Sequence, residues 1–195
     1  ETLRYRKLIW AADQASLYRA LEQPLPEKAR RQKELAERSR GIDSVLTLFL
    51  GTNLPPEQVR AICGAHAFYT SDTAGLSRLP VWQSLRCEGL DAVRAWLVSY
   101  LETTTFEISV PALRDPSLAP EGKTGLVVST LLDYALVKWF DNAGEYAALK
   151  ALASETILRV LGGSILPGLS QNVEFSLCST PLTIERETGN REGAI

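Results

Sequence analysis

The pattern of apolar and polar residues along the chain predicts short strands separated by amphipathic helices. Ser44–Leu50 is the clearest strand, and its apolar residues on both faces predict a central strand covered on both sides. Thr105–Val110 and Asn172–Cys178 alternate between apolar and polar residues, which is typical of strands with one buried face. Two further strands are expected at Gly125–Leu132 and Ala65–Thr70.

In the two alternating strands, apolar residues share one face and polar residues share the other. Phe106 lies on the face of Ile108, and Phe175 lies on the face of Val173. We expect these aromatic side chains to face the core, because apolar strand residues usually serve it. The polar positions are then expected to face a ligand cavity; they are Glu107, Ser109, Glu174 and Ser176.

Helical spacing of apolar residues predicts the longer helices. Glu145–Leu161 has a strong amphipathic pattern, and Gly162-Gly163 is expected to end it. Leu90–Leu101 is also expected to be helical, with two alternative inner faces: Val93, Leu97 and Leu101, or Trp96 and Tyr100. Shorter helices are expected at Pro56–Ile62 and Val81–Arg86.

The N-terminal region is predicted to contain a strand and two helices. Lys7–Ala12 is a short apolar run that predicts a buried strand, followed by a helix at Ala15–Leu21 with Asp13 as its N-cap. A second helix begins near Glu27 and is mostly charged, which favours a solvated surface helix. The alternative is a basic lid that contacts a membrane or an acidic partner.

Strands and helices do not alternate in strict βα units. This order predicts an α+β fold, with a mixed, largely antiparallel sheet and helices packed on one face.

Composition and charge narrow the functional classes. The apolar share of 45% and charged share of 23% are ordinary for a globular domain, and the net charge of -2 gives no electrostatic case for binding nucleic acid. No uncharged apolar run approaches the roughly 20 residues of a membrane span. One histidine and three separated cysteines make a structural metal site improbable and favour a reducing compartment, so we expect a cytoplasmic protein, with peripheral membrane contact as an alternative.

No complete catalytic motif is present. The glycine-rich dinucleotide and phosphate loops and the esterase GxSxG turn are absent from the sequence. The single histidine, His66, is more often a packed or surface residue than a catalyst. Glu107 and Glu174 could form a carboxylate pair, although solvated strand positions are the commoner outcome.

Three stretches resemble one known family. They are LIWAADQASLYRAL at residues 8–21, DPSLAPEGK at residues 115–123, and TPLTIERETGNREG at residues 180–193. Together they resemble the phytoene dehydrogenase-like FAD-dependent oxidoreductases, which include carotenoid desaturases and isomerases and relatives of retinol saturase. The resemblance spans nearly the whole chain, and its second and third stretches are the more specific ones.

The resemblance implies a domain organisation. Residues 1–14 would end the FAD-binding domain, residues 15–180 would form the substrate-binding domain, and residues 181–195 would lead into a C-terminal flavin-contacting segment. Members of the family carry a glycine-rich dinucleotide fold before this region. We therefore expect FAD in the full-length protein and weak FAD binding or none by this fragment, so that none stays bound to it, since the phosphate-binding turn is not in the sequence.

The resemblance also assigns candidate site residues. Those expected at the cofactor are Ala11, Ala12, Asp13, Gly189 and Gly193, with the glycines allowing close backbone approach. An apolar substrate needs a mainly apolar pocket, and the residues expected to complete it are Phe49, Tyr69 and Trp139.

The function expected from the resemblance is substrate binding in an FAD-dependent oxidoreductase that acts on an apolar compound, such as an isoprenoid or polyene. The expected partners are that small molecule and the rest of the flavin domain. The alternative is a freestanding, non-enzymatic α+β module that binds a ligand or a protein.

Overall fold

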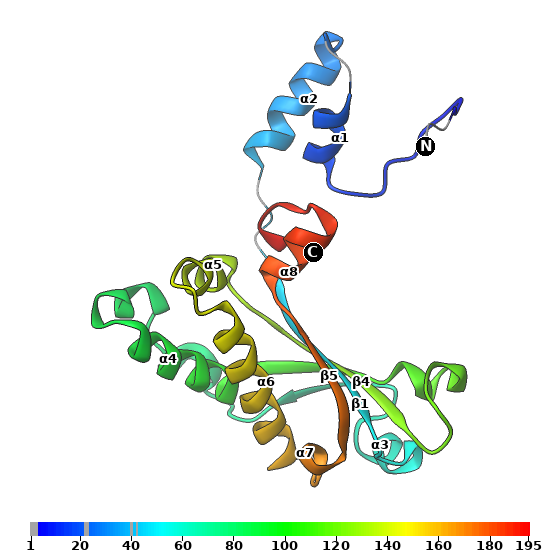
Figure 1. The fold of residues 1–195 in the computed structure, drawn as a ribbon, viewed down its shortest axis with the longest axis vertical. Coiled ribbons are helices and arrows are strands. Elements are labelled where there is room, and N and C mark those ends of the chain that lie inside the picture. The colour runs from blue at the N-terminus through cyan, green and yellow to red at the C-terminus, as the bar shows by residue number, and fades with distance from the viewer. Residues whose placement is uncertain (1–3, 22–23, 40, 42) are drawn as a thin grey trace.

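The computed structural model describes residues 4–21, 24–39, 41 and 43–195, which form a sheet-and-helix body and a two-helix arm (Figure 1). The arm consists of α1 (Gln14–Ala20) and α2 (Glu27–Arg38), which contact each other. The body carries the sheet and the remaining helices. The domain predicted at residues 15–180 therefore includes both the arm and most of the body.

Five strands form one open sheet in the order β2-β3-β4-β1-β5. Every pair of neighbouring strands is antiparallel, so the predicted α+β class is confirmed, and the described strands include no parallel pair. Five of the six strands expected from the sequence lie in this sheet; they are β1 (Val45–Thr52), β2 (His66–Thr70), β3 (Thr105–Ser109), β4 (Thr124–Leu131) and β5 (Val173–Ser179).

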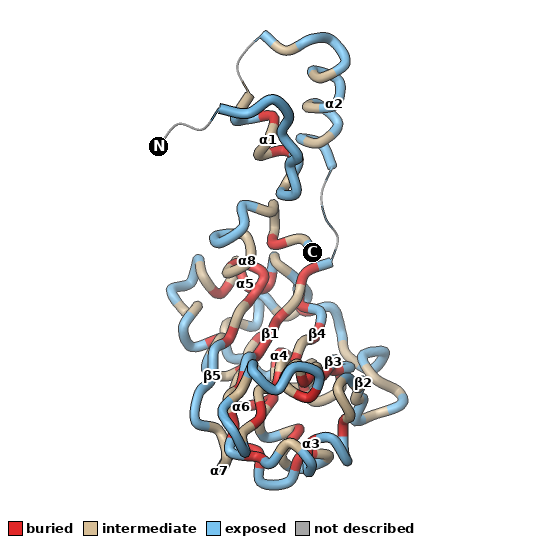
Figure 2. Tube along the Cα trace, turned by 90° about the vertical axis from the view of Figure 1, so that its right-hand side faces the viewer, coloured by how far each residue is buried: buried red, intermediate tan, exposed pale blue. Residues whose placement is uncertain are grey.

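Three helices lie together on one side of the sheet (Figure 1): α4 (Leu90–Thr103), α5 (Tyr134–Asn142) and α6 (Tyr146–Gly162). Buried residues concentrate along the strands and the inner surfaces of these helices (Figure 2). In α4 the buried residues are Val93, Leu97 and Leu101, so the first of the two predicted inner faces is confirmed.

The opposite side of the sheet is open. In β1, Leu46, Leu48 and Leu50 are almost fully buried, whereas Phe49 between them is 38% exposed. The prediction that β1 is covered on both sides is therefore wrong, because the helix layer gathers on the leucine side. We call the Phe49 side the open face.

Local sequence signals explain the helix boundaries. The Asp133 carboxylate accepts a hydrogen bond from the Ala135 amide at 2.8 Å and begins α5. Thr180 and Thr183 form a reciprocal capping box at the start of α8 (Pro181–Thr188). α6 ends at Gly162, as predicted.

The remaining elements are short. The predicted helix at Val81–Arg86 is a 3-10 helix, η2 (Trp82–Glu88). Among the described residues, no helix is long and apolar enough to cross a membrane. The other elements are α3 (Pro56–Cys63), α7 (Leu169–Asn172), η1 (Gly75–Arg78), η3 (Pro111–Leu113), η4 (Pro116–Leu118) and η5 (Arg191–Gly193).

The strand predicted at Lys7–Ala12 is absent. These residues have no regular secondary structure, and Ile9 is 93% exposed. A lone apolar run becomes a strand only when another strand pairs with it, and this segment pairs with none of the described strands. The helix that follows is confirmed, with the Asp13 carboxylate accepting from the Ser16 amide at 2.7 Å.

Candidate functional site

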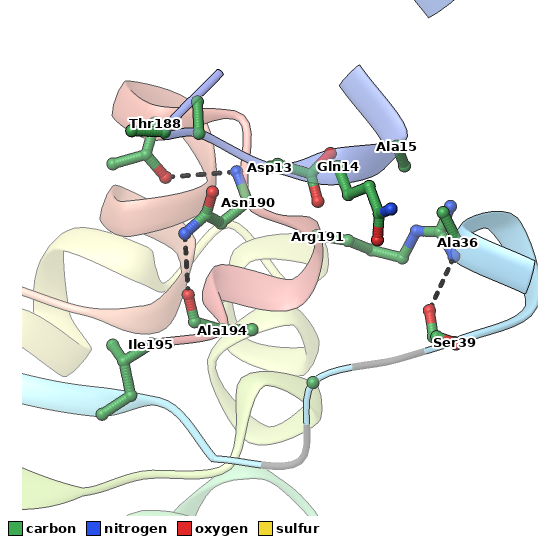
Figure 3. A pocket seen from close by; sticks show the side chains of 13 residues that line it. Asp13, Gln14, Ala15, Ala36, Ser39, Thr188, Asn190, Arg191, Ala194 and Ile195 are labelled. Atoms are coloured by element: carbon green, nitrogen blue, oxygen red, sulfur yellow. Dashed lines mark hydrogen bonds between the residues drawn. The ribbon is translucent and has the colours of Figure 1, made fainter. Parts of the chain in front are cut away.

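Two segments from opposite ends of the chain surround a hollow of about 640 Å³ between the arm and the body (Figure 3). We call it the arm–body hollow. Asp13, Gln14 and Ala15 approach it from the arm, and Asn190 and Arg191 approach it from the end of the chain. The complete lining is Ala11, Ala12, Asp13, Gln14, Ala15, Ala36, Ser39, Gly41, Thr188, Asn190, Arg191, Ala194 and Ile195.

Arg191 connects the two walls of the hollow. Its guanidinium donates hydrogen bonds to the carbonyl oxygens of Glu37, at 2.6 Å, and Ser39, at 3.2 Å. These carbonyls lie at the C-terminal end of α2, where a cation also interacts favourably with the helix dipole. A single side chain therefore joins the arm to the C-terminal segment.

The C-terminal segment is held in a tight turn. The Glu185 carboxylate accepts from the Tyr134 hydroxyl at 2.6 Å and from the Glu192 amide at 2.9 Å. Burial, followed by this hydrogen bond, raises the pKa of Tyr134 to about 12. Glu192 has a φ of 57°, an unusual conformation for a residue with a side chain. The turn places Asn190 and Arg191 at the hollow.

The two glycines expected at the cofactor have structural explanations of their own. Gly189 ends α8 with a φ of 75°, a left-handed conformation that favours glycine. At Gly193, an added Cβ would lie 2.1 Å from the carbonyl oxygen of Pro181. Neither glycine lines the arm–body hollow, although their neighbours Thr188, Asn190 and Ala194 do.

The open face forms a second candidate surface. One cross-strand row runs through all five strands, because consecutive members are register partners. The row consists of His66 on β2, Ser109 on β3, Val127 on β4, Phe49 on β1 and Leu177 on β5. Its members are apolar on β4, β1 and β5 and polar on β2 and β3.

Paired glycines create a trough in the apolar half of the open face. Gly51 and Gly125 are register partners, and neither places a side chain above the sheet. The cavity beside them measures about 360 Å³ and is bounded by Phe49, Val127 and Phe175. Its outer wall comes from the η3–η4 segment, through Pro111, Ala112 and Leu118.

The polar half of the open face carries paired side chains. His66 Nε2 lies 2.8 Å from Glu107 Oε1, and the Thr70 and Thr105 hydroxyls are 2.8 Å apart. A further cavity of about 640 Å³, which we call the strand-end hollow, includes Glu107, Thr70 and Phe68 in its lining. Ile195 lines both this cavity and the arm–body hollow, so the two cavities adjoin.

The three residues expected to line one substrate pocket lie in different places. Phe49 borders the glycine trough on the open face. Tyr69 is the register partner of the buried Phe106, so it faces the helix side, where it packs against the core. Trp139 on α5 lines a separate cavity of about 410 Å³ with Trp82.

The expected faces of β3 are confirmed, whereas those of β5 are wrong. Phe106 is fully buried and Glu107 is exposed, but Phe175 is 58% exposed. β5 is an edge strand, and its Cys178, the register partner of Leu48, faces the core. Ser176, the register partner of Leu50, therefore lies on the helix side, whereas Glu174 sits at a bulge between the pairs Gly51–Phe175 and Thr52–Val173.

Glu107 and Glu174 do not form a carboxylate pair. Glu107 is bonded to His66 on the open face, whereas Glu174 accepts from the Lys123 ammonium at 2.7 Å. This hydrogen bond is the main reason that the pKa of Glu174 is lowered.

Sequence reasoning missed one long-range polar contact, which is partly buried. The Trp82 indole donates to the Asp133 carboxylate at 2.7 Å, so one residue both caps α5 and holds η2. An aspartate directly after an apolar strand is a signal for the cap, but the Trp82 contact spans 51 residues. In the part of the chain that the structure describes, no group of three or more His, Cys, Asp or Glu side chains could hold a metal ion.

Comparisons with protein-family models and with curated proteins found no match for this chain. A functional interpretation therefore depends on the two surfaces described above.

Proposed function

We propose that the chain is the substrate-binding domain of an FAD-dependent oxidoreductase similar to the phytoene dehydrogenases. The observation that carries this proposal is the arm–body hollow. The sequence resemblance assigns Ala11–Asp13 and residues 181–195 to the border of a flavin site, and the fold brings both segments to one cavity. These segments are remote in sequence, so their proximity in the fold is an observation separate from the sequence resemblance that assigned them to a flavin site.

The lining of the hollow fits the ring portion of a flavin. Its volume of about 640 Å³ lies within the usual range for small-molecule sites, and alanine side chains leave room for a flat ring. The Asp13 carboxylate occupies the N-terminus of α1 and would repel phosphate. We therefore assign Ala11, Ala12 and Asn190 to the ring and expect no pyrophosphate site in this cavity.

The open face supplies the proposed substrate surface. The exposed side chains on this face include Phe49, Phe175 and Leu177. Large apolar side chains that cluster on a surface usually mark a site of contact with a ligand or a partner. The strand-end hollow on this face adjoins the arm–body hollow at Ile195. A substrate on the open face would thus lie next to the proposed flavin border.

These positions give the flavin and the protein's own residues different roles. A bound flavin would accept or deliver a hydride, while the protein's own residues orient the substrate and exclude water. The apolar side chains of the open face would hold the substrate by burying its hydrocarbon surface, at about 25 cal/mol per Å².

The test measures flavin binding by the wild-type chain and by the variant Ala12→Phe. Binding is monitored through the quenching of flavin fluorescence. Wild-type chain is expected to bind riboflavin and FAD with similar affinities, each weaker than about 10 μM, because only the ring is held. A phenylalanine at the exposed residue 12 fills the hollow and should abolish binding of both compounds.

The matched control is Ala147→Phe, which places the same side chain at an exposed position of α6 far from the hollow. This variant should bind riboflavin like the wild type. The proposal fails if riboflavin binding is absent, or if Ala12→Phe binds it as well as the control does.

The alternative function is a freestanding binding module without redox chemistry. One observation favours it: the open face offers an apolar surface to a ligand whether or not a flavin is near. The two functions are separated by the same titration, since a freestanding module has no reason to bind riboflavin at the arm–body hollow.

A further inference from the structure

β5 forms one border of the sheet and is exposed on both of its faces. The strand runs between α7 and α8 at this border (Figure 1). Phe175 and Leu177 are exposed on the open face, and Ser176 is exposed on the helix side. The helix layer therefore covers β5 incompletely, which leaves the outer edge of the strand accessible to another chain.

Backbone hydrogen bonds at the two ends of β1 show which neighbouring strand each of its residues faces. The Leu132 amide, on the β4 side, donates to the Ser44 carbonyl at 2.9 Å. The Asn53 amide donates to the Asn172 carbonyl, on the β5 side, at 2.8 Å. Successive residues of a strand direct their backbone groups to opposite neighbours. The even-numbered residues of β1 therefore bond to β4, and the odd-numbered residues bond to β5.

The same alternation identifies the residues of β5 that point outward. Phe49 is an odd-numbered residue of β1, so its register partner Leu177 directs its backbone groups back to β1. Ser176 and Cys178, on either side of Leu177, then direct their N–H and C=O groups away from the sheet. In the part of the chain that the structure describes, no strand pairs with this edge. Both residues can therefore bond to an added strand.

Residues 175–179 of β5 lack the features that protect an edge strand. Proteins usually guard such edges with charged side chains, prolines or bulges. The sequence of this stretch, FSLCS, contains no charged residue and no proline. The nearest bulge lies at Glu174, and the nearest proline is Pro181, the first residue of α8. The whole stretch is therefore suited to pairing with another strand.

This stretch is complementary to its own copy. A two-fold axis perpendicular to the sheet at Leu177 would align two β5 strands antiparallel and join the two open faces. Ser176 of each copy would then exchange backbone hydrogen bonds with Cys178 of the other copy. The two Leu177 side chains would lie opposite each other, with each Phe175 diagonally beside them. Since the stretch is uncharged, no like charges would meet across the axis.

We propose that two copies of the chain associate through β5, which joins their sheets into one continuous sheet. The occupant is a second copy because the same short stretch supplies both the outward backbone groups and the apolar side chains that would meet them. This interaction goes beyond the proposed function and does not require a flavin. The interface is small, so we expect a dissociation constant of about 10–100 μM and a monomer in dilute solution.

Sedimentation velocity of the wild-type chain at increasing concentration tests the association. At about 1 μM the chain should sediment as the 21.5 kDa monomer, and at about 300 μM most of it should sediment as a species of twice that mass. A chain that stays monomeric over this whole range overturns the proposal.

Leu177→Lys tests whether β5 is the interface. This variant places two ammonium groups opposite each other at the axis and removes the leucine pair, so the dissociation constant should rise about tenfold. Phe68→Lys is the matched control, because Phe68 is an exposed apolar residue on β2, the strand at the other border of the sheet. The control should dimerise like the wild type. Circular dichroism checks that both variants are folded.

Disulfide trapping tests the register of the two strands. In a Cys87→Ser background, Leu177→Cys would bring the thiols of two copies together on Cα atoms about 4.5 Å apart, which a disulfide can span. Air oxidation of the concentrated variant should therefore give covalent dimers on a non-reducing gel. Phe68→Cys in the same background is the control and should form them about tenfold more slowly.

Either variant can refute the interface. If Leu177→Lys dimerises as tightly as Phe68→Lys, the association uses another surface and the proposal is wrong. If the thiols at residues 177 and 68 cross-link at the same rate, the two β5 strands do not meet at Leu177 and the proposal is likewise wrong. Neither result changes the expected binding of riboflavin, so the proposed function is tested separately.

Discussion

The two faces of the sheet carry similar apolar residues but differ in how much of these side chains is exposed to solvent. On the helix side, Phe106 and Ile108 are fully buried beneath α4, α5 and α6. On the open face, Phe175 is 58% exposed and Leu177 is 52% exposed, although both are as apolar as their buried counterparts. Hydrophobicity alone therefore does not tell the two faces apart.

The difference has a physical meaning for function. A side chain packed among helices stabilises the fold by burying its surface, so its replacement is felt as a loss of stability. An exposed apolar cluster contributes little to the fold and retains its surface for a ligand or partner. The comparison assigns stability to one face and binding to the other, and the following variants test that assignment.

The largest expected effect is on stability. Phe106→Ala should lower the free energy of unfolding by about 3–5 kcal/mol, because a fully buried aromatic ring leaves a cavity. Phe175→Ala on the open face should change it by no more than about 0.5 kcal/mol. Urea unfolding followed by circular dichroism measures both, and equal losses would refute the assignment of the two faces.

A second comparison uses glycines. Gly193→Ala should destabilise the protein by about 1–3 kcal/mol, because its Cβ would lie 2.1 Å from the carbonyl oxygen of Pro181 and its φ is 64°. Gly125→Ala in the trough places its Cβ no nearer than 3.8 Å to the Leu50 carbonyl oxygen. It should change stability by less than about 1 kcal/mol.

A large loss of stability in Gly125→Ala would show that the trough glycine serves packing. Thermal unfolding of the two variants and the wild type measures both changes.

The variants expected to disturb the fold least compare the thiol reactivity of two neighbouring positions on β5, residues 177 and 178. Burial raises the pKa of the Cys178 thiol, which lowers its thiolate fraction and its reactivity. In a Cys87→Ser background, the native thiols should react with an aromatic disulfide reagent slowly. Adding Leu177→Cys on the open face should give one new thiol that reacts about 100-fold faster.

The absorbance of the released thiolate measures these rates, and unfolding in urea confirms that all thiols can react. Comparable rates for residues 177 and 178 would mean that β5 does not present alternate residues to opposite faces. Cys87 must be removed first, because it is exposed.

Local signals in the sequence were sufficient for most elements. The alternation in Thr105–Val110, the Asp13 cap and the glycines after α6 each predicted the structure that forms. These signals work because backbone geometry and capping hydrogen bonds involve residues within four positions of one another. The α+β class follows from their order along the chain.

Other features required the tertiary structure. Alternation in β5 separates Phe175 from Ser176, but only the position of the helices decides which of them faces the core. The strand expected at Lys7–Ala12 is absent because a strand depends on a partner elsewhere in the chain. The cap of α5 also depends on a distant residue, because the Asp133 carboxylate accepts a hydrogen bond from Trp82, which is 51 residues away in the sequence.

By itself, the sequence determined most of the elements, whereas the two segments at a flavin border are a prediction from the family resemblance. The fold decided that Asp13 and Arg191 line the same hollow, and that Phe49, Tyr69 and Trp139 lie apart. The physical reason is the range of the forces involved. Capping and alternation are local, whereas a cavity is the space left when distant elements pack, and no short stretch of sequence encodes that space.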